Sequence, residues 1–118
     1  MSRPFHGVFS SADAHAPATE PDARIQLFED GTTTALTIGS TEQCVISSYE
    51  ATVGTTMTVK LFSGADLTIA DGELLDIAKL PVGKVAGNVT RRCIVGTYPK
   101  IKTDLAGQID VIARGWIE

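Results

Sequence analysis

The sequence has few of the residues that most often carry chemistry. Its 118 residues include two histidines, two cysteines and one tryptophan, and aromatic residues make up only 6%. Both histidines, His6 and His15, lie in a segment that we expect to be flexible, and a mobile imidazole cannot be held beside a nucleophile. Cys44 and Cys93 lie far apart in the chain and form no metal-ligand spacing. The sequence therefore predicts no cofactor, no metal site and a protein that is not an enzyme.

Positive charge is also scarce. The net charge is −4 and the isoelectric point is about 5.1, and the densest basic cluster is the pair Arg91-Arg92. Because nucleic-acid binding draws most of its affinity from Lys and Arg side chains on phosphates, we expect no nucleic-acid partner. No apolar run reaches membrane-spanning length and no secretory signal begins the chain, so we expect synthesis in a cytosol and no membrane partner.

Two groups of residues leave alternatives open. The cysteines lie in apolar stretches, where a free cysteine behaves as a small hydrophobic residue, so we expect two reduced core thiols, with a cross-strand disulfide as the alternative. Most acidic side chains fall in predicted turns, where aspartate commonly bonds its own backbone: Glu29, Asp30, Asp66, Asp71, Glu73 and Asp104. A catalytic pair of carboxylates or a calcium site is the alternative there.

The remaining composition favours β-structure. The chain is 43% hydrophobic and 20% charged, which suits one folded domain, and its many β-branched residues favour pleated sheets. Strict alternation predicts strands at 56–62 and at the C-terminus, where residues 109, 111, 113, 115 and 117 share one face. Further strands are expected at 24–28, 34–38, 43–53, 67–69, 73–80 and 89–97, with a short extended stretch from 98 and a loop over 81–87. Residues 73–80 also have the alternative of a two-turn helix.

About eight short strands between Gly, Pro and Asp breaks predict an all-β fold, an antiparallel β-sandwich or a jelly-roll-like barrel. Residues 23–118 are expected to form this single β-domain. Residues 1–22 contain three prolines and no evident period, so we expect an extended, flexible N-terminal arm that becomes ordered only on a partner. Phe5, Val8 and Phe9 are its expected adhesive points, and the alternative is an untethered tail in which these apolar residues are incidental.

The last strand is apolar on both faces. Ile112 and Trp116 lie opposite the regular apolar row of residues 109–117, and Tyr49 and Phe62 likewise fall opposite the apolar faces of their strands. Either the strand is central and packs on both sides, or the second face is a docking patch. On the second interpretation the partner-binding residues are Phe5, Val8, Phe9, Ile112 and Trp116, and the protein forms a homotrimer through its last strand.

The arrangement of an N-terminal arm and a compact β-domain resembles the head decoration, or capsid cement, proteins of tailed bacteriophages. The similarity extends over the whole chain and includes the segments TVKLFSGADLTIADGELL and TYPKIKTDLAGQIDVIARGWIE. It implies a virion structural protein, made in the host cytoplasm, that binds the major capsid protein on the outside of an icosahedral capsid and stabilises it. A phage tail component and a carbohydrate-binding β-sandwich are the alternatives, and a cupin-like enzyme is a rival from another class.

Overall fold

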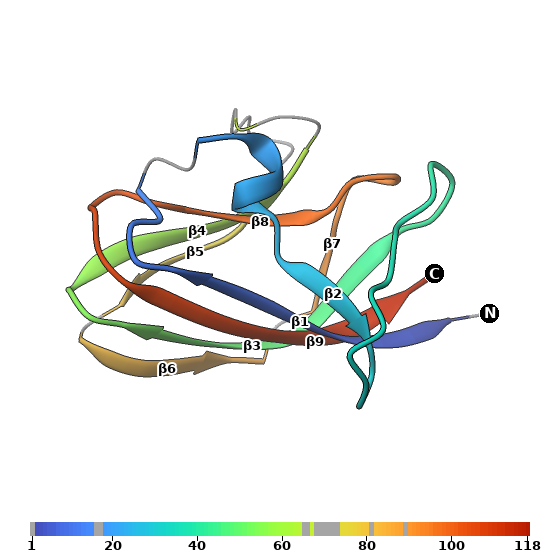
Figure 1. Ribbon diagram of the computed structural model, residues 1–118, viewed down its shortest axis with the longest axis horizontal. Helices are drawn as coiled ribbons and strands as arrows, with labels where there is room; N and C mark the ends of the chain where they lie inside the picture. Colours follow the sequence, from blue (N-terminus) through green and yellow to red (C-terminus); the bar gives the residue numbers. More distant parts are fainter. Residues whose placement is uncertain (1, 16–17, 65–66, 68–73, 81, 89) are drawn as a thin grey trace.

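The chain forms a sandwich of two antiparallel β-sheets, which Figure 1 shows as two layers. This computed structural model describes residues 2–15, 18–64, 67, 74–80, 82–88 and 90–118. The fold class predicted from the strand pattern is confirmed, in the form of a sandwich with two separate sheets.

The larger sheet has six strands in the order β2-β1-β9-β3-β6, and β7 also pairs with β3. Its strands are β1 (Arg3–Ser11), β2 (Gln26–Glu29), β3 (Cys44–Val53), β6 (Gly83–Gly87), β7 (Arg91–Arg92) and β9 (Ile109–Ile117). The smaller sheet has the order β5-β4-β8 and consists of β4 (Met57–Ser63), β5 (Leu74–Leu80) and β8 (Pro99–Thr103). A short 3-10 helix, η1 (Glu20–Ala23), lies beside β8 (Figure 1).

The core lies between the two sheets and follows the predicted alternation. Along β9, Ile109, Val111, Ala113 and Ile117 are buried, whereas Ile112 on the opposite face is exposed. In β4, the side chains of Met57, Val59 and Leu61 enter the same core. Because alternate residues of a strand point to opposite faces, the inward-facing residues of each sheet form one apolar face, and the two faces fill the space between the sheets.

The expected flexible arm is wrong for residues 3–11, which form β1 in the middle of the larger sheet. All nine residues of β1 pair with β9, from Arg3 opposite Ile117 to Ser11 opposite Ile109. The sequence shows no clear apolar alternation here, because Gly7 and not a third apolar side chain takes the inward position between Phe5 and Phe9. A Cβ atom at Gly7 would lie 2.6 Å from Cγ2 of Ile25, so close packing excludes a side chain there. The β-domain therefore begins near the N-terminus and not at residue 23.

Three predicted segments differ in detail. Residues 34–38 form no regular strand and contact β2 through a single bridge, Phe28 to Ala35. The expected loop over 81–87 contains β6. Of the expected strand over 89–97, the described residues 90–97 pair as a strand only at Arg91–Arg92. β6 and β7 are short, so their pairing depends on the neighbouring strand β3 more than on their own pattern.

The described part of the ambiguous segment 73–80, residues 74–80, is a strand and not a helix. β5 covers Leu74–Leu80 and pairs antiparallel with β4. Residues 68–69 of the predicted strand 67–69, and the predicted turns at residues 66 and 71, lie outside the described residues.

The backbones of the paired strands β9 and β3 approach closely at one point. The register between these strands shifts between Ile46 and Ser48, which is a β-bulge, and Gly115 lies opposite Ile46. A Cβ atom on Gly115 would lie 1.8 Å from the carbonyl oxygen of Val45. Only glycine fits this position of β9, because any side chain would collide with the backbone of β3.

Candidate functional site

The outer face of the larger sheet carries an exposed apolar pair. Val8 on β1 lies directly opposite Ile112 on β9, and their side chains are 39% and 45% exposed. Two β-branched side chains in adjacent central strands form one continuous apolar area, since opposite residues of an antiparallel pair point to the same face. This pair is the centre of the candidate site.

Polar residues surround the pair on the same face. Gln26 lies opposite Val8, and Glu50 lies opposite Ile112, so both ends of this row are polar. Asp110 and Arg114 stand two residues before and after Ile112 on β9, and the Asp110 carboxylate accepts a hydrogen bond of 2.5 Å from Ser10. The Val8–Ile112 surface, defined by Val8, Ile112, Gln26, Glu50, Asp110 and Arg114, has the apolar centre and polar rim of a protein-binding patch.

The next row of this face begins with a stacked aromatic pair. The ring of His6 lies 5.5 Å from the ring of Phe28, with 22° between the planes. His6 also lies opposite Arg114. The imidazole predicted to lie in a mobile arm is therefore held on β1 by stacking, and it extends the apolar centre towards β2.

The five residues expected to bind a partner divide into two groups. Phe5 and Phe9 are only 1% and 4% exposed, because they are on the inward face of β1 and belong to the core. They fill this chain's own core in the structure, so the expectation that they are free adhesive points is wrong. Val8 and Ile112 meet on the outer face, and their partner-binding role stays a prediction.

Trp116, the fifth residue, is half-buried near the chain ends. Its Nε1 donates a hydrogen bond of 2.9 Å to the Glu118 carboxylate, which also accepts a hydrogen bond of 3.3 Å from Arg92. Trp116 lies opposite Val45, which is fully buried. Its indole ring is thus part of a local polar cluster and less available for a partner than Ile112.

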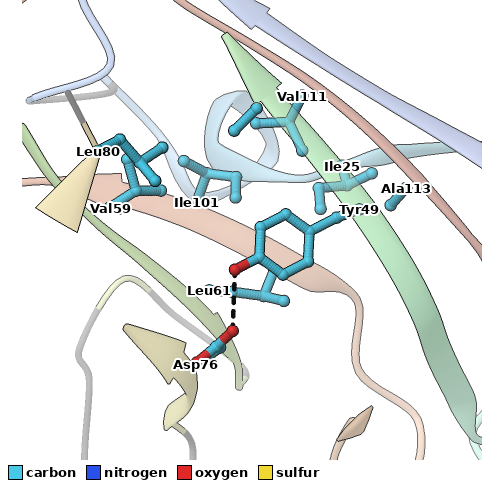
Figure 2. Close-up of a pocket in the computed structure, with 10 residues that line it drawn as sticks. Ile25, Tyr49, Val59, Leu61, Asp76, Leu80, Ile101, Val111 and Ala113 are labelled. Atoms are coloured by element: carbon cyan, nitrogen blue, oxygen red, sulfur yellow. Dashed lines mark hydrogen bonds between the residues drawn. The ribbon is translucent and has the colours of Figure 1, made fainter. Parts of the chain in front are cut away.

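A small apolar pocket lies between the two sheets (Figure 2). Its volume is about 20 Å³, which is room for one water molecule at most. Its lining is apolar except for Tyr49 and Asp76, whose side chains meet at one side in a hydrogen bond of 2.9 Å (Figure 2). The pocket is too small for an organic substrate, so it is a packing feature and not a ligand site.

The Tyr49 phenol is held in its neutral form. Burial, followed by the hydrogen bond to Asp76 and the charge of that carboxylate, raises the pKa of Tyr49 to about 12. The neutral phenol donates a hydrogen bond to Asp76 and cannot serve as a base near neutral pH. Its ring lies against β6, where a Cβ atom on Gly87 would come within 2.8 Å of the ring. The sequence placed Tyr49 on the face opposite the more regular apolar residues of its strand, whereas in the structure it is partly buried and packs against the core.

A buried lysine forms the most polar part of the interior. The side chain of Lys100 on β8 is fully buried, and its Nζ lies 2.9 Å from the Glu20 carboxylate and also donates to the carbonyl oxygen of Gly64. Glu20 accepts two further hydrogen bonds of 3.0 Å from Arg24, whose guanidinium lies 4.4 Å from the centre of the Tyr98 ring. Sequence analysis missed this cluster, and the spacing of Glu20 and Arg24 by four residues was its only local signal.

The remaining candidate groups are metal ligands, the second histidine and the turn carboxylates. No cluster of three or more His, Cys, Asp or Glu side chains that could hold a metal ion occurs among the described residues. His15 lies on its own near the carbonyl oxygen of Thr103, at 3.4 Å. Among the turn carboxylates considered above, Asp66, Asp71 and Glu73 lie outside the described residues.

The class that the fold defines is an antiparallel β-sandwich with an exposed apolar area on its larger sheet. Comparison with protein-family models and with curated protein sequences finds no significant match for this chain. Within the described residues, no helix has the length and apolar character needed to cross a membrane.

Proposed function

We propose that this protein is a non-enzymatic virion structural protein that binds the outside of a tailed-bacteriophage capsid and stabilises it. The single observation that carries the proposal is the Val8–Ile112 surface, where two apolar side chains are exposed side by side at the centre of the larger sheet. Exposing such a pair costs free energy in water unless a partner covers it. The partner in this proposal is the major capsid protein.

Two further features support this proposal. The net charge of −4 disfavours binding to the packaged nucleic acid and leaves a protein surface as the better partner. The strands β1 and β9 each have a paired neighbour on both sides, so the backbone that carries the exposed side chains is held rigidly. A rigid surface loses little conformational entropy on docking, which favours binding to a repeated lattice.

The homotrimer is a separate part of the proposal. Because β9 lies between β1 and β3, its edges are already paired and only its outer face can contact another subunit. Ile112 is the exposed apolar residue on that face of β9, so a subunit contact there competes with the capsid contact for the same surface. Light scattering of the free protein and of the protein released from particles measures this association, and a monomer in both samples contradicts the trimer.

The direct test is co-sedimentation with capsids assembled from the major capsid protein encoded in the same genome. We expect the double variant Val8→Lys with Ile112→Lys to bind at least about 30-fold more weakly, which is the effect of removing an interface centre. The matched control is Leu105→Lys, which changes an apolar side chain that is 49% exposed in the turn before β9. Circular dichroism should show that both variants keep the fold.

The other outcomes of this experiment are equally definite. Unchanged capsid binding by the double variant rejects the Val8–Ile112 surface as the docking site. Absence of wild-type binding to any capsid rejects the decoration function. Recovery of the protein in purified tails, or binding to polysaccharides, would assign it instead to the tail or to the carbohydrate-binding class.

A further inference from the structure

The pairing of β3 with β7 brings the two cysteines opposite each other. Arg91 lies opposite Ile46 and Arg92 lies opposite Val45, so the next pair in this antiparallel register is Cys93 and Cys44. The backbone N–H of Cys93 donates a hydrogen bond of 2.9 Å to the carbonyl oxygen of Cys44.

This geometry suits a disulfide. Opposite residues in a hydrogen-bonded antiparallel pair have Cα atoms about 5.5 Å apart. Disulfides form at Cα separations of about 4.4–6.8 Å. Side chains at opposite positions share a face, and both thiols belong to the same core cluster with exposures of 0% and 2%. Neither sulfur has to cross the sheet to reach the other.

The two thiols also interact in the reduced state. A hydrogen bond with Cys93, and then burial, raise the pKa of the Cys44 thiol well above its ordinary value. Both cysteines are free in the structure. Each thiol therefore already has the other sulfur as its neighbour, and little rearrangement separates the dithiol from the disulfide.

We propose that Cys44 and Cys93 form a dithiol–disulfide pair, reduced in this structure and cross-linked when the protein meets a low-molecular-weight disulfide such as oxidised glutathione. The bond joins β3 to the segment that follows β7 and closes the loop from residue 44 to residue 93, which contains β4, β5 and β6. This inference concerns the domain itself and does not depend on the proposed function.

The reaction is thiol–disulfide exchange in two steps. The thiolate of one cysteine attacks a sulfur of oxidised glutathione, forming a mixed disulfide and releasing a glutathione thiolate. The other cysteine sulfur then attacks the protein sulfur of the mixed disulfide and releases the second glutathione thiolate. The two protein thiols give up two protons and two electrons, which convert one oxidised glutathione into two glutathione thiols.

The short β7 strand provides the access that this reaction needs. Because both sulfurs are buried, the first attack requires a local opening. β7 has two residues, and the residues just after Cys93 are largely exposed, with Ile94 at 42% and Val95 at 51%. Opening of this edge segment exposes Cys93 without separating the central strands, and the disulfide would then hold the segment closed.

The test uses the full wild-type chain equilibrated in glutathione buffers, once folded and once unfolded in urea. Acid quenching, alkylation and mass spectrometry give the fraction cross-linked, and peptide mapping locates the bond. We expect the equilibrium constant for oxidation to be at least about 30-fold larger in the folded protein, equivalent to about 2 kcal/mol. The oxidised protein should melt about 5–10 °C above the reduced protein.

The controls are Cys44→Ser and Cys93→Ser, which should give no intramolecular cross-link and no rise in melting temperature after oxidation. The wild-type measurement decides the proposal even if a serine variant fails to fold. An equilibrium constant that is equal or smaller in the folded protein overturns it. A disulfide between two copies of the chain, or an oxidised form that melts below the reduced form, overturns it as well.

Discussion

The ammonium group of Lys100 is buried, and the carboxylate of Glu20 contacts it at 2.9 Å. A buried charge needs such a partner, because leaving it in a low-dielectric interior without one costs several kcal/mol. Replacing the charged side chain itself by an apolar one of similar length is much less costly, since no charge remains to be solvated. The two ends of this ion pair should therefore respond differently to substitution.

We expect Glu20→Gln to lower the free energy of unfolding by about 2–3 kcal/mol, and Lys100→Met to lower it by less. Urea unfolding followed by circular dichroism measures both changes. Glu29→Gln, at an exposed position at the end of β2, is the matched control and should cause no measurable change. A larger loss in Lys100→Met than in Glu20→Gln would contradict this account of the ion pair.

Glu20 also makes stability depend on pH. Burial raises the pKa of Glu20, but hydrogen bonds from Arg24 and Lys100 and their positive charges outweigh burial and hold it below its ordinary 4.5. A carboxyl group with a lower pKa in the folded state binds protons more readily when the chain is unfolded. Its contribution is therefore fully present above pH 4.5 and is lost as the pH falls through the folded-state value.

We expect the free energy of unfolding to decrease as the pH falls below about 4.5, and to decrease less steeply in Glu20→Gln. Urea unfolding at intervals from about pH 6 to about pH 3 measures the two slopes. The difference between wild type and variant isolates Glu20 from the exposed Glu42 and Glu118, whose pKa values are also lowered. Parallel slopes would show that Glu20 titrates alike in the folded and unfolded chain.

At the scale of elements, β1 decides whether the larger sheet can form. It is hydrogen-bonded to β2 on one side and to β9 on the other, and it contributes Phe5 and Phe9 to the core. Removing it would leave β2 without a partner in the sheet and would expose one edge of β9. A strand in this position belongs to the folding unit of the domain.

We expect deletion of residues 1–11 to unfold the protein, and Phe5→Ala or Phe9→Ala to cost about 3–5 kcal/mol each. Val8→Ala is the matched control on the same strand and should be nearly neutral, because its side chain points outwards and is 39% exposed. Circular dichroism and thermal melting measure all four proteins. A folded deletion variant with an unchanged melting temperature would show that residues 3–11 are a dispensable arm.

At the scale of the whole molecule, the proposed capsid contact has an apolar centre and few formal charges. Only Glu50, Asp110 and Arg114 of the Val8–Ile112 surface are charged, and both signs are present. On the proposed function, capsid affinity should change by less than about threefold between ~0.05 and ~0.5 M salt, since screening acts mainly on charges. Co-sedimentation at both salt concentrations measures this. A loss of tenfold or more at high salt would point to a charge-driven contact elsewhere.

The sequence by itself determined the strands whose pattern is local. Alternation over 56–62 and 109–117 correctly predicted the inward-facing rows of β4 and β9, because side-chain direction in a strand depends only on position along that strand. It did not predict burial on the other face of β4, where Phe62 is also fully buried. The frequent Gly, Pro and Asp breaks correctly indicated short antiparallel strands and a sandwich.

The tertiary structure alone decided the features that depend on distant partners. β1 is a strand because β9, about a hundred residues later, supplies its hydrogen bonds, and Gly7 completes its pattern only once Ile25 packs against it. Lys100 is buried because Glu20 reaches it, and Cys44 meets Cys93 because β7 pairs with β3. Local periodicity indicates the direction in which a side chain points. Whether that side chain is buried, and which strand its own strand pairs with, depends on segments that can come from anywhere in the chain.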